Sequence, residues 1–256
     1  MKFHHREGRQ PTVVLVHGNS SSSAVWQPLI RCLPDQAVLS FDLRGHGESG
    51  WAEPPAYSTK DYADDIGELL DRVGIDDFIL VGHSNGALSS AYFAARHQPS
   101  PKALVYIDIA PKVPQAQIDY FHARASGVSR VWTSLDKLTS TMNAADPTVP
   151  GALFMTYLAD FAEAVEGGIR QKLDPQTFGA WSPADVWADL ESLDIPLFLV
   201  RGETSRVLSR ENAEEMQSRM PKAHFEVIDG AGHFLMLAQP ESLANVIRAA
   251  LSAVSE

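Results

Sequence analysis

The sequence predicts an α/β fold in which a mostly parallel sheet is flanked by helices and carries an inserted helical cap. Short runs rich in β-branched residues alternate with helical stretches over residues 1–110 and again over 189–256. These runs have the apolar character of strands that are buried on both faces of a parallel sheet. Residues 111–188 instead contain aromatic and helical segments punctuated by prolines, with no convincing strand. We therefore expect a core of 1–110 and 189–256 and a helical cap, or lid, of 111–188.

The expected elements follow in chain order. Strands are predicted at 11–18, 37–43, 77–83 and 102–110, and after the cap at 196–200 and 223–229. A helix is predicted at 59–73, where apolar residues recur at helical spacing and Thr59 is the expected N-cap. Further helices are predicted at 84–97, near 209–219 and near 240–253.

The bulk composition excludes several classes of partner. The chain has 256 residues and a formal net charge of −11, with no cluster of lysine or arginine, so we expect neither nucleic acid nor an anionic membrane as a partner. The single cysteine, Cys32, cannot form an intramolecular disulfide. The first ten residues are polar, and the longest apolar runs are too short to span a bilayer. These features favour a cytoplasmic location.

The segment "GHSNG" at 82–86 is the strongest chemical signal. It fits the pattern G-x-S-x-G, follows an apolar strand and precedes a helix, which is the context that this pattern requires. A sharp strand-to-helix turn needs small residues at both flanks and would leave Ser84 exposed at the carboxyl edge of the sheet. The N–H groups at the start of the helix would favour negative charge there. Ser84 is therefore the predicted nucleophile.

Three other loops at strand ends support this interpretation. The segment "VHGN" ends the first core strand, so the backbone N–H groups of Asn19 and Asn85 are predicted to form an oxyanion hole. The segment "DLRGHGESG" follows the second strand with turn glycines. The segment "GAGHF" follows the last strand and presents His233 on a loop. The order of nucleophile first and histidine near the C-terminus is typical of a serine hydrolase of this architecture.

The chain resembles the α/β-hydrolase superfamily over nearly its whole length. The matching segments are "HGN", "DLRGHGES", "GHSNG" and "GAGHF". The resemblance implies the α/β-hydrolase fold, with Ser84 and His233 as nucleophile and base. It also implies a third residue, a carboxylate that holds the histidine. Many members place an aspartate in the loop after the seventh strand, where this chain reads "RGETSR" and offers Ser205 or Arg206 instead.

The identity of the carboxylate has two main answers and a minor one. Asp108 ends the strand next to the nucleophile strand, and Glu203 lies in the loop that lacks the aspartate, so both could reach the histidine loop at one sheet edge. Asp229 is a minor candidate. The chain resembles small ester and thioester hydrolases that carry the acid directly after the sixth strand, with "DIAP" there and "GETS" later. That resemblance favours Asp108, with Glu203 as second choice.

The predicted substrate pocket rests on weaker signals. Trp26 and Phe234 flank the catalytic segments, Trp132 is one of the cap aromatics, and His83 either lines the site beside the nucleophile or packs behind it. These residues indicate a small-molecule substrate with an apolar acyl group or a lactone ring. The remaining histidines lack metal-ligand spacing, so no metal is expected, and acyl transfer to water needs no cofactor.

The predicted activity is cleavage of a carboxylic ester, thioester or lactone through an acyl-enzyme. The segment "HGNSSS" also resembles lactone-cleaving members of the superfamily. Two alternatives use the same scaffold. One is a cofactor-independent dioxygenase that cleaves a heteroaromatic ring, and the other is a small-molecule receptor that turns over very slowly. A dehalogenase is disfavoured because the nucleophile is a serine and not a carboxylate.

Overall fold

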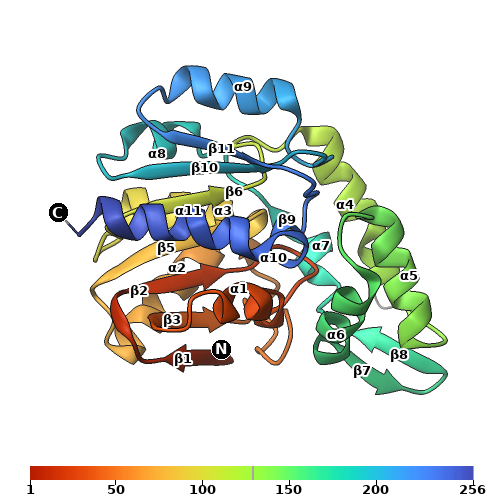
Figure 1. The fold of residues 1–256 in the computed structure, drawn as a ribbon. Coiled ribbons are helices and arrows are strands. Elements are labelled where there is room, and N and C mark those ends of the chain that lie inside the picture. Colours follow the sequence, from red (N-terminus) through yellow and green to blue (C-terminus); the bar gives the residue numbers. More distant parts are fainter. Residues whose placement is uncertain (129, 256) are drawn as a thin grey trace.

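A seven-stranded sheet forms the centre of the computed structural model, which describes residues 1–128 and 130–255 (Figure 1). The edge strand β1 is antiparallel to its neighbour and the other six strands are parallel. In spatial order the strands are β1 (Phe3–Arg6), β3 (Gln36–Phe41), β2 (Arg9–Val16), β5 (Phe78–His83), β6 (Leu104–Ile107), β10 (Leu197–Gly202) and β11 (His224–Ile228). The six strands predicted from the sequence are all present, and β1 is an addition.

Helices cover both faces of the sheet, which explains why the central strands β5, β6 and β10 are buried along their whole length. Along β5, Ile79 and Val81 pack into one core cluster while Phe78 and Leu80 pack into the other, because successive side chains point to opposite faces. The first cluster includes residues of the short helix η1 (Ser23–Trp26), α1 (Gln27–Arg31), α10 (Leu235–Ala238) and α11 (Pro240–Ala253). The second includes residues of α2 (Thr59–Val73), α3 (Asn85–Arg96), α8 (Trp187–Ser192) and α9 (Arg210–Arg219).

The N-cap of one helix and the first residue of another differ from the sequence prediction by one residue. The N-cap of α2 is Ser58 and not Thr59, because the Ser58 hydroxyl accepts from the backbone N–H of Asp61 while the Asp61 carboxylate accepts from the N–H of Ser58. The Thr59 hydroxyl accepts instead from the N–H of Ala184, 2.9 Å away, and so links this helix to the segment before α8. Helix α3 begins at Asn85 and leaves Ser84 outside it.

The described residues of 111–188, the segment predicted to be a cap and called the cap below, lie beside the edge at which β5 and β6 end (Figure 1). Its helices are α4 (Gln115–Val128), α5 (Leu135–Ala145), α6 (Gly151–Phe161) and α7 (Gln176–Gly179). The two-residue strand β9 (Trp181–Ser182) pairs in parallel with β4 (Tyr57–Ser58) of the core. In the described part of the chain, none of the helices combines the length and apolar character needed to cross a bilayer.

The prediction of a cap without strands was wrong. Strands β7 (Ala162–Val165) and β8 (Gly168–Gln171) form an antiparallel hairpin whose turn uses the positive φ angles of Gly167 and Gly168. The backbone of Trp132 exchanges two hydrogen bonds with that of Ile169, which extends the pairing by one residue. Each strand has only four residues, and nearly all of them are half-buried, so neither a long apolar run nor a clear alternation marks them in the sequence.

The strand register brings four chain segments to one place. His83 at the end of β5 lies opposite Ile107 of β6, and Ile107 lies opposite Val200 of β10. Gly202 at the end of β10 lies opposite Ile228 of β11. The residues that follow these four strands therefore meet at the same edge of the sheet, below the cap.

Candidate active site

Ser84 occupies a strained turn between β5 and α3. Its φ of 54° and ψ of −124° are unusual for a residue with a side chain and cost about 1–3 kcal/mol. The turn also requires the glycines on both sides. A Cβ on Gly82 would lie 2.5 Å from the carbonyl oxygen of Gly86, and a Cβ on Gly86 would lie 2.4 Å from that of His17. The structure thus places Ser84 at the strand-to-helix turn that the sequence predicts, with its side chain on the wall of a cavity.

His233 and Asp108 are hydrogen-bonded at this edge. Nδ1 of His233 lies 2.7 Å from Oδ2 of Asp108, and the aspartate is completely buried. Because an ionised carboxylate only accepts, Nδ1 carries the proton and Nε2 carries the lone pair. His233 and Ser84 line the same cavity. The arrangement brings an imidazole and a hydroxyl to the wall of one cavity, with a carboxylate bonded to the imidazole.

Two further donors hold the Asp108 carboxylate. The Ser205 hydroxyl donates to Oδ2 over 2.5 Å, and the backbone N–H of Gly202 donates to Oδ1 over 3.2 Å. Ser205 is one of the two residues that align with the aspartate many relatives have in this loop. In this chain it donates to the carboxylate supplied by the neighbouring strand. Arg201 stabilises the loop by donating to the carbonyl oxygens of Glu203, Ser205 and Leu208.

The other two acid candidates lie away from the histidine side chain. Glu203 points along the outside of the loop, where Oε2 accepts from the backbone N–H of Gly230 over 2.8 Å. Asp229 is exposed at the end of β11. Of the three carboxylates considered from the sequence, Asp108 is therefore the one that the structure brings to His233.

The two amides predicted for the oxyanion hole are free to bind a ligand. Asn19 lies three residues after the end of β2 and lines the same cavity as Ser84, and Asn85, the first residue of α3, follows Ser84 directly in the chain. Among the described residues, neither N–H has an acceptor. The Asn85 side chain is held from the cap, because its Oδ1 accepts from the indole Nε1 of Trp181 over 2.8 Å. This geometry suits stabilisation of an oxyanion by two backbone donors.

A cavity of about 550 Å³ lies between the cap and these residues. Its walls include Asn19, Ser84 and His233 from the core, and Trp132 and Phe234 are on its surface as predicted. A larger hollow of about 710 Å³ lies elsewhere and is lined by Trp51, Ala52, Glu53, Pro54, Pro55, Asp174, Pro175 and Gln176. No serine, cysteine or histidine lines that hollow. The candidate catalytic residues Ser84 and His233 line the smaller cavity.

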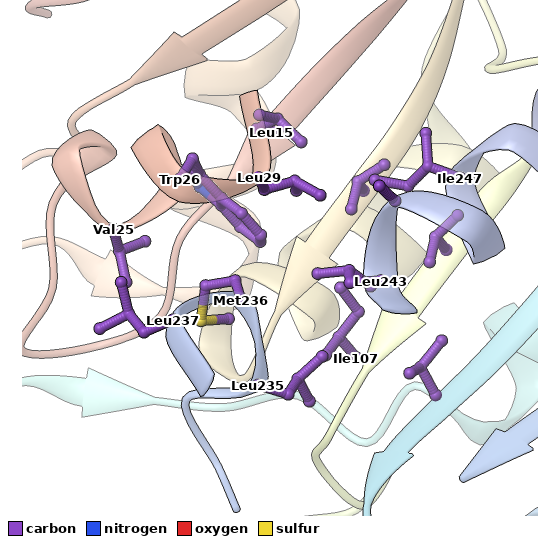
Figure 2. Packing of buried hydrophobic residues seen from close by; sticks show 14 of the residues in the cluster. Leu15, Val25, Trp26, Leu29, Ile107, Leu235, Met236, Leu237, Leu243 and Ile247 are labelled. Carbon is purple, nitrogen blue, oxygen red and sulfur yellow. The ribbon is translucent and has the colours of Figure 1, made fainter. Parts of the chain in front are cut away.

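Trp26 and His83 do not line the cavity, so the prediction of Trp26 as a pocket residue was wrong, and of the two positions considered for His83 it has the one behind the nucleophile. Trp26 is fully buried in the core cluster beside Leu29 and Met236 (Figure 2). His83 is buried below the histidine loop, and its Nε2 bonds to the backbone oxygen of His233 over 2.9 Å. Burial, together with the nearby His233, lowers the pKa of His83 well below its usual value. Trp26 and His83 therefore support the site from behind.

Asp146 of the cap holds the histidine loop, a role that sequence reasoning missed. Its Oδ2 accepts from the backbone N–H of Phe234 over 2.8 Å, and its Oδ1 accepts from the Thr148 hydroxyl over 2.5 Å. The Thr148 oxygen in turn accepts from the N–H of Gly232 over 2.9 Å. The backbone N–H groups of Gly232 and Phe234, on either side of His233, are thus hydrogen-bonded to side chains of the cap. No local signal distinguishes this aspartate, which follows a helix and precedes a proline like an ordinary turn residue.

Replacing Asp146 by alanine is expected to destabilise the protein by about 1–3 kcal/mol and to lower kcat roughly tenfold, because buried donors of the histidine loop lose their acceptor. Urea unfolding and steady-state kinetics would measure the two effects. The exposed cap residue Asp160 gives a matched control, since Asp160→Ala should change neither quantity. A variant with normal stability and normal kcat would contradict the proposed contact.

Three buried histidines make the fold sensitive to acid. Burial is the main cause that lowers the pKa of His46 to about 3 and the pKa values of His17 and His83 below the usual 6.5. Below about pH 6.5 the unfolded chain binds protons that the native state does not. The free energy of unfolding therefore decreases as the pH is lowered, by up to about 1.4 kcal/mol per pH unit for each histidine. We expect the urea concentration at the unfolding midpoint to decrease as the pH is lowered from 7.5 to 5.5. A midpoint constant over this range would show that these histidines are not held neutral.

In the described part of the chain, no group of three or more histidine, cysteine, aspartate or glutamate side chains is placed to hold a metal ion.

Comparisons with known proteins agree on one architecture. The model of the family described as alpha/beta hydrolase fold matches residues 11–240. The chain is 29% identical over 240 residues to the 2-(acetamidomethylene)succinate hydrolase of Mesorhizobium japonicum, with 92% of this chain and 86% of that protein covered. It is 25% identical over 254 residues to an esterase of Mycobacterium tuberculosis, with 95% and 84% covered. A solved structure of E-2-(acetamidomethylene)succinate hydrolase superposes with a TM-score of 0.87 at 27% identity, covering 98% of this chain and 94% of that one.

Proposed function

Because this chain belongs to the alpha/beta hydrolase fold family, we propose that it is a serine hydrolase that cleaves a carboxylic ester, thioester or lactone. Ser84 is the nucleophile, His233 the general base and Asp108 the acid of the triad. The observation that carries the proposal is the bond between His233 Nδ1 and the buried Asp108 carboxylate, on a histidine that shares a cavity with Ser84. The similarity to proteins named esterase and hydrolase supports the same reaction class.

The reaction proceeds by acyl transfer to water. His233 Nε2 takes the Ser84 proton while Oγ attacks the carbonyl carbon, and the resulting oxyanion lies against the N–H groups of Asn19 and Asn85. The tetrahedral intermediate collapses, and the leaving group takes the proton from His233. Water then attacks the acyl-enzyme with His233 as base, which releases the acid and restores the Ser84 hydroxyl. Asp108 holds the histidine tautomer and stabilises the imidazolium in both steps.

The cavity favours a small substrate. A volume of about 550 Å³ lies within the range of small-molecule sites. Aromatic side chains from the cap and the histidine loop form part of its wall, including Phe121, Trp132, Phe178 and Phe234. These aromatic walls would contact the apolar part of a bound ester.

A panel of aryl esters, thioesters and lactones of graded size tests the proposal. We expect multiple turnovers with at least one class and, on rapid acid quench, an acyl group on the peptide that contains Ser84, detected by mass spectrometry. Oxygen consumption with a heteroaromatic substrate, without any acylated serine, would instead identify a ring-cleaving dioxygenase. Ligand binding that raises the melting temperature without turnover would identify a receptor.

A further inference from the structure

The charged residues of the active-site cavity are all basic. These charged residues are Arg124 and Arg130 of the cap, and none of the described residues that line the cavity is an aspartate or a glutamate. This distribution departs from the chain as a whole, which has 32 acidic and 21 basic side chains. We propose that the cavity binds an anionic substrate, an ester or thioester whose acyl part carries a second, free carboxylate held by Arg124 and Arg130. The ester cleavage in this inference rests on the proposed hydrolase function. The binding of an anion by Arg124 and Arg130 does not, and it can be tested separately.

Aromatic rings hold both guanidinium groups in place. Arg124 donates to the hydroxyl of Tyr120 and lies 5.2 Å from the centre of that ring, and Arg130 lies 4.0 Å from the centre of the Trp132 ring. Such cation–π contacts are worth about 0.5–1 kcal/mol at exposed sites and restrict the side chain before a ligand arrives. Tyr120 and Trp132 line the same cavity. Both arginines are exposed to solvent, and each contacts an aromatic ring at the wall of the site.

Neither arginine is neutralised by a carboxylate in the part of the chain that the structure describes. The ion pairs among these residues use other basic groups, and Arg130 makes no hydrogen bond there. An arginine presents N–H donors in a planar fork that matches the two oxygens of a carboxylate. A pair of them without a counter-ion, on the wall of a cavity that contains a nucleophile, is suited to an anionic group at the far end of a substrate.

Local charge outweighs the overall charge of the protein at this site. At an ionic strength of 0.15 M the Debye length is about 8 Å, so most of the acidic surface is screened from a ligand inside the cavity. Two guanidinium groups that contact the ligand are screened much less. The net charge of −11 slows the approach of an anion without preventing its binding.

Matched substrates test the inference: the 4-nitrophenyl monoester of glutaric acid, which is anionic, and 4-nitrophenyl pentanoate, which is neutral and similar in length. The wild-type protein should prefer the anionic ester by at least about 100-fold in kcat/KM. Arg124→Gln and Arg130→Gln should each lower this preference by roughly 10- to 100-fold, mainly through KM, since a charge-assisted hydrogen bond is worth about 1.5–3 kcal/mol. Arg72→Gln, on the exposed face of α2, should leave the preference as it is.

Two results would overturn the inference. One is equal kcat/KM for both esters in the wild-type protein, and the other is an equal loss for both esters in the arginine variants, which would indicate general damage to the cap. Calorimetric binding of glutarate to the Ser84→Ala protein tests the anion site without turnover. Binding that Arg124→Gln and Arg130→Gln abolish supports the site even where the hydrolase proposal fails, and absence of binding counts against it.

Discussion

Replacing Ser84 by alanine is expected to lower kcat by about five to six orders of magnitude, because in a triad the nucleophile and the base act as a unit. Alanine at position 84 would adopt the same φ of 54° at a steric cost similar to that of serine. The fold should therefore persist, and only the hydroxyl should be lost. The wild-type protein should react with a fluorophosphonate probe, and Ser84→Ala should not. Initial rates with the best ester of the panel and intact-mass spectrometry of the labelled protein would measure the two effects.

A matched control for this variant is Ser100→Ala, which changes an exposed loop serine far along the chain from the turn. It should retain full labelling and full activity. Persistent labelling of Ser84→Ala would show that another residue is the nucleophile. Equal inactivation of both variants would point to a contaminating hydrolase or to loss of the fold, which circular dichroism would reveal.

Replacing Asp108 by asparagine is expected to lower kcat by about four orders of magnitude with little change in KM. The asparagine has the same size, but its amide can donate to Nδ1 of His233 and so favour the tautomer whose Nε2 carries the proton. That tautomer cannot accept the proton of Ser84. Steady-state kinetics on the same ester would measure the loss, and protein NMR of the histidine ring would report the tautomer directly.

Glu203→Gln is the matched control for Asp108→Asn, because both changes neutralise a carboxylate without changing its size. We expect less than a threefold effect on kcat, since Glu203 contacts the backbone of Gly230. If Glu203→Gln gave the large loss and Asp108→Asn the small one, the choice of acid would be wrong. A double variant, Asp108→Asn with Ser205→Asp, should recover part of the activity, because the Ser205 hydroxyl lies 2.5 Å from the Asp108 carboxylate.

Much of the core was predictable because each local signal there agrees with the tertiary contacts. The helices at 59–73 and 240–253 have the predicted bounds, since a continuous apolar stripe at helical spacing faces the sheet. The strands end within a few residues of their predicted ends. The turn at Ser84 was also predictable, because few residue types other than glycine fit the flanking positions.

The rest of the site depends on contacts between distant parts of the chain. Asp146 and Phe234 are 88 residues apart, and their hydrogen bond has no local mark in the sequence. Trp26 lies near a catalytic segment along the chain, but η1 directs it into the core cluster under α10 and α11. The choice between Asp108 and Glu203 stayed open from the residues alone because both follow strands that end at the same edge of the sheet. Side-chain direction separates them.

The backbone angles at Ser84 and Asp108 have a consequence for laboratory evolution. Among the described residues, three that are not glycine have a positive φ: Ser20, Ser84 and Asp108. At Ser84, whose side chain accepts no hydrogen bond from the rest of the described chain, glycine would relieve part of the strain, about 1 kcal/mol. At Asp108 the same change would leave the buried donors of Ser205 and Gly202 without an acceptor, which costs about 1–3 kcal/mol each. A library selected only for heat resistance should therefore accumulate glycine at 84, not at 108, and become inactive as it becomes more stable. Selection for thermostable variants of this protein must keep an activity screen in every round.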